Sequence, residues 1–258
     1  MNLLIIIIVT VLYAVIIGWT WSSLGDIERK KKILITLSII LILCVGCFGI
    51  YVNDYYHAQD DALEILNHKN VKKVNSNLIT LTPKKKSDVG IIFYPGAKVE
   101  NTAYLPLLKH LTNKGYNCYL LKMPFNMAIF NKNAANKIIN QYPNIKHWYI
   151  CGHSMGGAMA SSYVSKNKDK VDGLILLGSY IYGDVSDKDA LTIYGSLNTS
   201  VKKKIDYKRN IVVIKGGNHA NFGNYGHQKG DAKATISRKK QQNQTVKAIN
   251  NFIEKRLN

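Results

Sequence analysis

The sequence has little cysteine, and the positions of its four cysteines limit the kinds of site that the protein can contain. Cys44 and Cys47 fall inside a long apolar run, whereas Cys118 and Cys151 fall in short apolar runs that are typical of strands. Free thiols packed among apolar groups are expected at all four positions, so we predict no disulfide framework. We expect neither a metal ion nor a cofactor.

Acidic residues are also scarce: 16 Asp and Glu stand against 35 Lys and Arg, which gives a net charge of +19. The first 60 residues contain four residues of each sign, so the whole excess lies in residues 61–258. Such a surface favours an anionic neighbour, either acidic lipid headgroups or an anionic envelope polymer, although lysines that only maintain solubility would give the same composition. The basic clusters at 84–86 and 202–204 lack interleaved aromatic residues, so nucleic acid is not an expected partner.

Charge is absent from two long stretches near the start of the chain. Residues 3–21 and 33–52 are uncharged runs of 19 and 20 residues, each long enough to cross about 30 Å of hydrocarbon as a helix. No Lys or Arg precedes the first run, which is also long for the apolar core of a signal peptide. The two runs predict a two-span transmembrane hairpin with its connector over residues 1–58, followed by one domain over residues 59–258.

The loop between the two runs sets the predicted orientation. This loop ends in four consecutive cations, Arg29 to Lys32, and basic loops stay on the cytoplasmic side of a membrane. We therefore expect a multi-pass protein of the cell membrane whose large domain lies outside the cytoplasm.

After the hairpin, apolar strand-like runs alternate with longer helical patterns. Strand-like runs occur at 77–81, 89–95, 117–123, 147–152, 173–179, 190–196 and 210–217, and helical patterns at 104–115, 133–142, 155–167 and 238–257. Strands of continuous Ile, Leu and Val that are separated by helices predict an α/β fold, a mostly parallel sheet with helices on both faces. Residues 53–75 are expected to form a polar, partly helical connector.

The stretch CGHSMGGAMA, residues 151–160, carries the clearest functional signal. Ser154 stands between a predicted strand and a predicted helix in the pattern Gly-x-Ser-x-Gly. A turn this sharp lifts the serine Oγ above the sheet, and the glycines at 152 and 156 avoid collisions with neighbouring elements. Ser154 is therefore the predicted nucleophile.

A serine hydroxyl needs a base, and His219 follows the last predicted strand in KGGNHANFG. A serine first and a histidine after the final strand is the order found in α/β-hydrolases. His227 is a rival base, whereas the side chain of His153 should point into the packing. The backbone N–H groups of Ala97 and Met155 are the predicted donors to an oxyanion.

Phe125 and Met127 follow a predicted strand in MPFNMAIF, and either an acyl pocket or ordinary core packing explains their position.

The segments FYPGAKVENTAYLPLL, LLKMPFNMAIF, CGHSMGGAMA and GGNHANFGNYGHQKGD resemble a bacterial α/β-hydrolase family of the dienelactone-hydrolase-like type. The resemblance extends from about residue 90 to residue 252. It implies an α/β-hydrolase fold, a Ser154–His219 pair and esterase-like chemistry, without defining a substrate.

The third member of the expected triad departs from the family pattern. The family would place an acid at position 198, where this chain has Asn198. An asparagine can accept a hydrogen bond from the histidine and hold its orientation, but it stabilises an imidazolium less well than a carboxylate does. Asp184, after the preceding strand, is the alternative acid.

Together these residues predict a membrane-anchored serine hydrolase that cleaves a carboxylic ester through an acyl-enzyme on Ser154. The expected substrate is a small-molecule or lipid-like ester. One alternative is an acyltransferase that uses the same groups. The other is a non-catalytic, membrane-tethered binding domain with the hydrolase fold, which the asparagine at 198 would favour.

Overall fold

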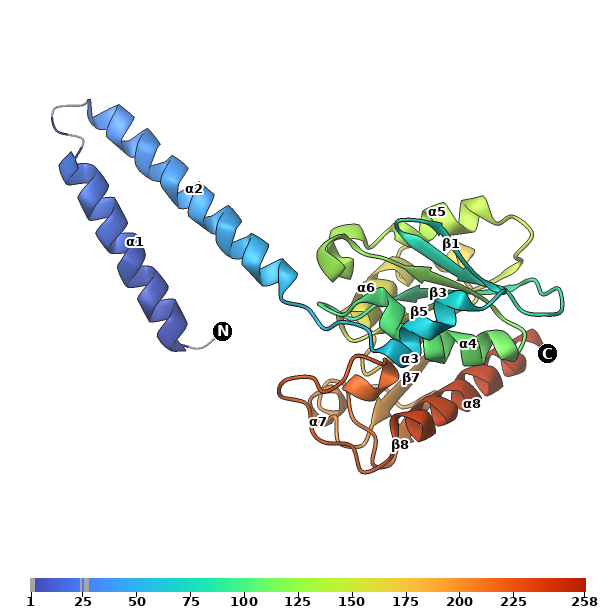
Figure 1. Cartoon of the computed structure of the whole chain (residues 1–258). Coiled ribbons are helices and arrows are strands. Elements are labelled where there is room, and N and C mark those ends of the chain that lie inside the picture. Colours follow the sequence, from blue (N-terminus) through green and yellow to red (C-terminus); the bar gives the residue numbers. More distant parts are fainter. Residues whose placement is uncertain (1–2, 24, 26–27) are drawn as a thin grey trace. The chain divides into compact units, whose positions relative to one another are not determined.

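The computed structural model describes residues 3–23, 25 and 28–258, and the chain divides into two compact units, Met1–Asp54 and Tyr55–Asn258. The first unit contains two long helices, α1 (Leu3–Ser23) and α2 (Arg29–Asn53) (Figure 1). Within this unit the indole Nε1 of Trp21 donates to the Thr36 hydroxyl at 2.9 Å. Residues 24, 26 and 27 of the predicted loop lie outside the described residues.

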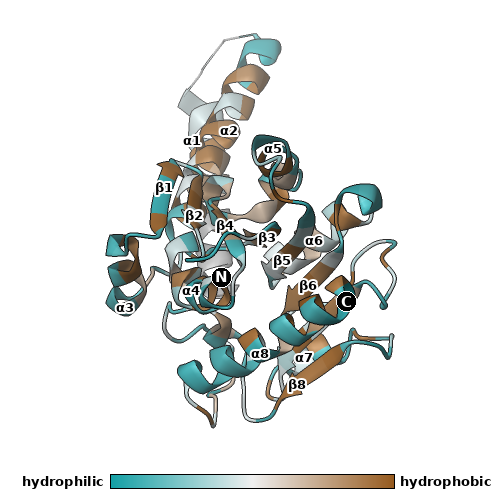
Figure 2. Cartoon of the chain, turned by 90° about the vertical axis from the view of Figure 1, so that its right-hand side faces the viewer, coloured by the Kyte–Doolittle hydropathy of each residue, from teal (hydrophilic) through white to brown (hydrophobic). Residues whose placement is uncertain are grey.

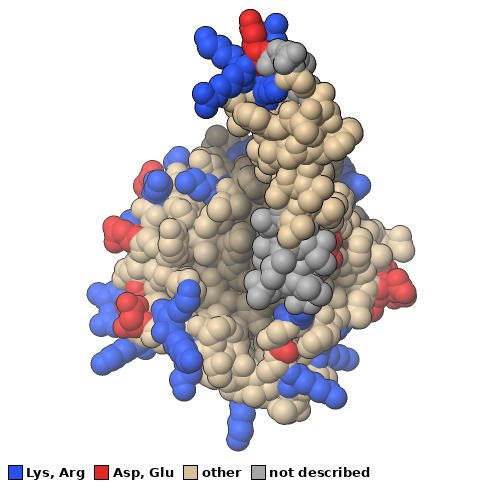
Figure 3. Space-filling view, turned by 90° about the vertical axis from the view of Figure 1, so that its left-hand side faces the viewer, with Lys and Arg blue, Asp and Glu red and all other residues tan. Residues whose placement is uncertain are grey.

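The basic segment at Arg29 was expected in the loop, but the structure places it inside α2, whose first turn contains all four cations. These cations form a blue cluster at one end of the first unit (Figure 3). By length and apolar composition α2 could cross a membrane, and it is the one helix among the described residues that meets both conditions. The side chains of α1 are described only from Val11 onward, so the first predicted span stays a prediction.

The second unit is built on one sheet, whose described strands follow the order β1-β2-β4-β3-β5-β6-β7-β8. Strands β1 and β2 pair antiparallel, β2 also pairs antiparallel with β4, and every pairing from β4 to β8 is parallel. The strands span Val71–Asn75 (β1), Leu78–Leu81 (β2), Val89–Tyr94 (β3), Asn117–Leu121 (β4), His147–His153 (β5), Gly173–Leu177 (β6), Ala190–Gly195 (β7) and Ile211–Ile214 (β8). The prediction of a mostly parallel sheet is confirmed.

The prediction of a polar connector over residues 53–75 was wrong at its end, because Val71–Asn75 forms the edge strand β1. Its sequence VKKVN is mostly polar, and it folds as a strand because a tight turn returns the chain antiparallel to β2. In that turn the side-chain oxygen of Asn75 accepts the N–H of Asn77 at 2.8 Å. Lysines on an edge strand also discourage pairing with another chain.

Helices cover both faces of the sheet, as predicted. The helices of this unit are α3 (Asp60–Leu63), α4 (Leu105–Asn113), α5 (Ala134–Gln141), α6 (Met155–Val164), α7 (Thr199–Lys202) and α8 (Arg238–Leu257). Successive residues of β3 show the two-sided burial: Ile91 packs in the cluster with α4 and α8, and Ile92 in the cluster with α5 and α6. In Figure 2 the strands are largely brown, whereas α8 shows much teal.

The parallel strands place their carboxyl ends along one edge of the sheet. The turn after β3 contains Gly96 and Ala97, β5 leads into Ser154, β6 into Gly178, β7 into Asn198 and β8 into His219. The chain continues from β3 to one neighbour, β4, and then returns to its other neighbour, β5. Such a reversal opens a crevice at the carboxyl ends, where parallel sheets bind ligands.

Candidate active site

Ser154 occupies the tight turn between β5 and α6. Its φ of 53° and ψ of −125° are unusual for a residue with a side chain, and the turn is held by its neighbours. The Ser154 N–H donates to the Leu177 carbonyl at 2.9 Å, and the Ser154 carbonyl accepts from Ala158 at 3.1 Å. The sharp turn therefore ties the nucleophile both to β6 and to the first turn of α6.

Two glycines make this turn possible by allowing backbone segments to approach closely. A Cβ at Gly156 would lie 2.2 Å from the carbonyl oxygen of Pro95, and one at Gly152 would lie 2.5 Å from the carbonyl oxygen of Gly156. Neither collision can be relieved by a side-chain rotation, because both involve backbone atoms. The Gly-x-Ser-x-Gly pattern is thus a packing requirement of the β3, β5 and α6 junction.

His219 lies in the loop after β8, where Asn198 contacts its ring and Asp231 binds its backbone. Ring atom Nδ1 lies 2.7 Å from the Asn198 amide nitrogen, and the backbone N–H of His219 donates to Asp231 at 3.1 Å. A second oxygen of Asp231 accepts the Ala220 N–H at 2.7 Å. Burial lowers the pKa of His219 below its ordinary 6.5, and the nearby charge of Asp231 partly opposes that shift. The imidazole is therefore mostly neutral at pH 7, as a general base must be.

The amide of Asn198 is buried, and both of its ends have partners. Its oxygen accepts from the Ser200 hydroxyl at 2.9 Å, while its nitrogen faces Nδ1 of His219. A half-turn of the amide exchanges the two atoms. The oxygen would then accept from a protonated Nδ1, and the amide nitrogen would donate to Ser200, because a hydroxyl can both donate and accept. Ser200 therefore supports either orientation of this amide.

Room for the Asn198–His219 pair depends on Gly178, at the end of β6. Its φ is +52°, and a Cβ there would lie 2.9 Å from Nδ1 of His219. A side chain at 178 would thus be disfavoured by backbone conformation and would also press against the histidine ring.

The predicted oxyanion donors lie on the two sides of the close contact between β3 and α6. In the described part of the chain, no protein acceptor takes the N–H of Ala97 or that of Met155. Met155 also lines the cavity that contains Ser154. Both N–H groups thus lack a protein acceptor among the described residues, but Ala97 is not among the residues that line this cavity.

A buried hydrogen-bond chain connects the turn after β3 with the histidine loop. The Gly96 N–H donates to the Tyr104 hydroxyl at 3.1 Å, and that hydroxyl lies 2.8 Å from Nδ1 of His153. Nε2 of His153 lies 3.0 Å from the carbonyl oxygen of His219. A carbonyl can only accept, so Nε2 carries the proton and Tyr104 donates to Nδ1. Burial and the neighbouring His219 keep the pKa of His153 well below its ordinary value, so the ring stays neutral.

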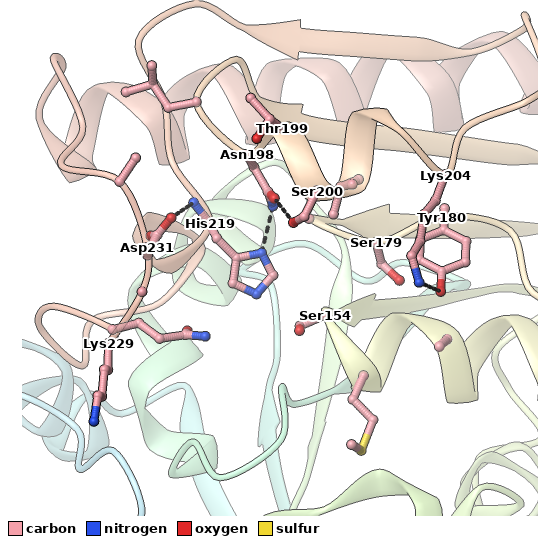
Figure 4. A pocket seen from close by; sticks show the side chains of 18 residues that line it. Ser154, Ser179, Tyr180, Asn198, Thr199, Ser200, Lys204, His219, Lys229 and Asp231 are labelled. Atoms are coloured by element: carbon pink, nitrogen blue, oxygen red, sulfur yellow. Dashed lines mark hydrogen bonds between the residues drawn. The ribbon is translucent and has the colours of Figure 1, made fainter. Parts of the chain in front are cut away.

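Ser154 and His219 line one cavity of about 620 Å³, and Figure 4 shows them facing each other across it. Polar and apolar groups contribute about equally to the rest of its lining. The loop after β6 supplies Ser179 and Tyr180, and α7 with the residues after it supplies Thr199, Ser200 and Lys204. The histidine loop supplies Gln228, Lys229 and Asp231. Leu197 and Val201 provide part of the apolar surface.

Several residues proposed from the sequence lie elsewhere. Asp184 is exposed and bonds the Lys168 ammonium at 2.6 Å, so Asn198 is the residue that the structure brings to His219. His227, Phe125 and Met127 do not line the cavity. Phe125 is half exposed and packs edge-on against Phe130, and Met127 is buried.

Three residues of this arrangement were not identified from the sequence: Asp231, Ser200 and Tyr104. Asp231 lies 12 residues after His219, in a loop rich in glycine. Such a loop can fold back on its own beginning, so a carboxylate near its end was the available signal for a contact with His219. Ser200, two residues after Asn198, has the spacing of a local side-chain hydrogen bond. Nothing in the local sequence marks Tyr104, which reaches the site through the packing of the segment before α4.

Comparisons with known proteins agree with this architecture. Residues 90–243 match the model of a family described as Alpha/beta hydrolase family. The comparison with curated proteins gives no match.

Solved structures give fold-level similarity. A soluble variant of monoglyceride lipase from Saccharomyces cerevisiae has a TM-score of 0.50 and 11% identity, covering 72% of this chain and 94% of that chain. Est1E from Butyrivibrio proteoclasticus has a TM-score of 0.50 and 12% identity, covering 72% and 98%. Dienelactone hydrolase from Anabaena variabilis has a TM-score of 0.46 and 10% identity, covering 71% and 94%. At these identities, the first two similarities show a shared fold.

Proposed function

The chain belongs to the alpha/beta hydrolase family, and from this premise we propose that it is a serine hydrolase that cleaves a carboxylic ester through an acyl-enzyme on Ser154. The observation that carries the proposal is the shared cavity of Ser154 and His219, with the histidine held by Asn198. Two structures with the same fold are named as a monoglyceride lipase and as Est1E, which is consistent with ester chemistry.

In the proposed first step, Nε2 of His219 takes the proton of the Ser154 hydroxyl while the serine oxygen attacks the ester carbonyl. Nε2 must be unprotonated at that moment, so the proton of the neutral ring must be on Nδ1. The Asn198 amide must therefore present its oxygen to Nδ1, which is the orientation reached by the half-turn described above. Asn198 thus selects the reactive tautomer of the histidine.

The developing negative charge on the substrate oxygen would be received by the N–H groups of Ala97 and Met155. One such donor typically contributes roughly a hundredfold or more to the rate. The imidazolium then returns its proton to the leaving alcohol. In the second half-reaction, water attacks the acyl-enzyme by the same route and releases the acid and the free serine.

We further propose that the first unit anchors this hydrolase as a two-span membrane hairpin, with the large domain outside the cytoplasm. The apolar 25-residue helix α2 and the uncharged α1 support an anchor, and the cations at Arg29–Lys32 support the orientation. A C-terminal alkaline phosphatase fusion, which is active only outside the cytoplasm, should be active, and a C-terminal green fluorescent protein fusion exported by the same route should be dark. The reverse pattern would place the domain in the cytoplasm.

The proposed chemistry predicts covalent modification of one residue. A fluorophosphonate probe should label the folded full chain at Ser154, and Ser154→Ala should abolish both labelling and hydrolysis of a short-chain ester. Peptide mapping by mass spectrometry locates the label. Ser162→Ala, a change on the same helix outside the cavity lining, is the matched control and should leave both unchanged. Absence of label on folded protein would refute the serine mechanism.

The third triad position gives a separate prediction. Asn198→Ala removes the group that selects the His219 tautomer, so kcat for a short-chain ester should fall by roughly a hundredfold. Asp184→Asn changes an exposed, lysine-paired carboxylate and should leave kcat within about twofold. Steady-state kinetics, with circular dichroism as a check on folding, distinguish the two; the opposite ranking would reassign the third member to Asp184.

The lowered pKa of His219 predicts the pH dependence. The base works only when neutral, so the decline of kcat/KM at low pH should have its midpoint below 6.5. Asp231 raises the pKa of His219, so Asp231→Asn should move this decline to still lower pH. Asp184→Asn should not move it. A midpoint that rises in Asp231→Asn would contradict the assignment of His219 as the base.

A further inference from the structure

We propose that the substrate of this site carries an anionic oxygen group, a carboxylate or a phosphate, which binds Lys204 and Tyr180 at the wall of the cavity. This inference rests on the proposed function, since it names the class of ester that the Ser154 site accepts. It is carried by the charge, the hydrogen bonds and the position of side chains that the catalytic steps do not use.

Lys204 and Tyr180 form a pair on the cavity wall from two separate loops. Tyr180 follows β6, and Lys204 follows α7 in the segment after β7. The lysine ammonium donates to the tyrosine hydroxyl at 3.2 Å and lies 5.1 Å from the centroid of its ring (Figure 4). The ammonium keeps two further hydrogens and the tyrosine keeps its own O–H hydrogen, so the pair can still donate to a ligand oxygen.

The balance of charge in the cavity favours an anion. Lys204 and Lys229 lie on opposite sides of Ser154 in Figure 4, and Asp231 is the one acid among the lining residues that the structure describes. The two oxygens of Asp231 already accept the N–H groups of His219 and Ala220. Among the ion pairs of residues 28–258, neither cavity lysine has a carboxylate partner, whereas Lys168 has Asp184.

The side of the cavity that Ser179, Tyr180 and Lys204 form also argues against an ester that places a long alkyl chain there. Such a chain against Tyr180, Ser179 and Lys204 would remove water from these groups without replacing its hydrogen bonds, which costs free energy. A carboxylate or phosphate restores those bonds and adds a charge-assisted one to the ammonium. The wall therefore selects for a charged group at a short distance from the scissile ester.

Two matched pairs of esters test this on the full chain. The first pair places the charge in the acyl part: the 4-nitrophenyl monoester of glutaric acid against 4-nitrophenyl pentanoate. The second places a phosphate in the alcohol part: the monobutyrate of glycerol 3-phosphate against glycerol monobutyrate. In at least one pair, kcat/KM for the anionic ester should exceed that for its neutral partner by about tenfold, the effect of one charge-assisted hydrogen bond.

Variants distinguish the effect of Lys204 on substrate preference from the effect of the protein's overall positive charge. Lys204→Gln should reduce that preference by about tenfold, and Lys204→Arg should retain most of it. Lys203→Gln is the matched control, because it removes the same charge from the adjacent exposed residue, which does not line the cavity, and it should leave the preference unchanged. No preference in either pair, or an equal loss in Lys203→Gln and Lys204→Gln, overturns the inference.

A binding measurement tests the recognition of the anionic group independently of ester hydrolysis. Calorimetry with Ser154→Ala protein should show tighter binding of the preferred anionic ester than of its neutral partner, and Lys204→Gln should remove the difference. If the anionic ester binds in this way but wild-type protein neither hydrolyses it nor takes the fluorophosphonate label, the inference stands and the serine-hydrolase proposal fails. If hydrolysis occurs without selective binding, the serine-hydrolase proposal stands and the inference fails.

Discussion

The close approach of the turn between β5 and α6 to the end of β3 is the constraint on which the rest of this site depends. Gly156 lies so near the carbonyl oxygens of Tyr94 and Pro95 that no side chain fits between them. This contact holds the first turn of α6, directly after the unusual backbone of Ser154, against the end of β3. A change at Gly156 would therefore disturb both the turn that contains Ser154 and the segment that leads to Ala97.

The histidine is positioned by a different kind of interaction, a set of buried polar contacts made by its own loop. Gln241 on α8 accepts the Asn218 N–H at 3.0 Å and donates to the Asn218 carbonyl at 2.9 Å, as a neighbouring strand would. Asp231 binds the next two N–H groups, and His153 binds the His219 carbonyl. Because a buried polar group without a partner is costly, these bonds hold the loop in one conformation. The ring of His219 can then remain neutral and still be precisely oriented.

Much of the fold could be predicted from the sequence, because continuous apolar strands and amphipathic helices carry their own periodicity. That Ser154 and His219 lie near each other could be predicted too, since a glycine-flanked turn and the order of the two residues are local features. The strand at Val71–Asn75 was missed because it is polar and depends on its antiparallel partner. The cavity wall was missed for a related reason. Lys204 and Tyr180 are 24 residues apart, and only the neighbouring positions of β6 and β7 bring them together.

The asparagine at 198 connects the proposed catalysis with the proposed substrate. A carboxylate in its place would stabilise the imidazolium, but it would also add a second negative charge beside Asp231 in a partly enclosed cavity. Charges at such a site interact more strongly than in bulk water, so that carboxylate would repel an anionic ester. A neutral amide orients His219 while leaving two lysines against one engaged aspartate. The proposed triad is therefore compatible with an anionic substrate, because Asn198 adds no negative charge to the cavity that Lys204 lines.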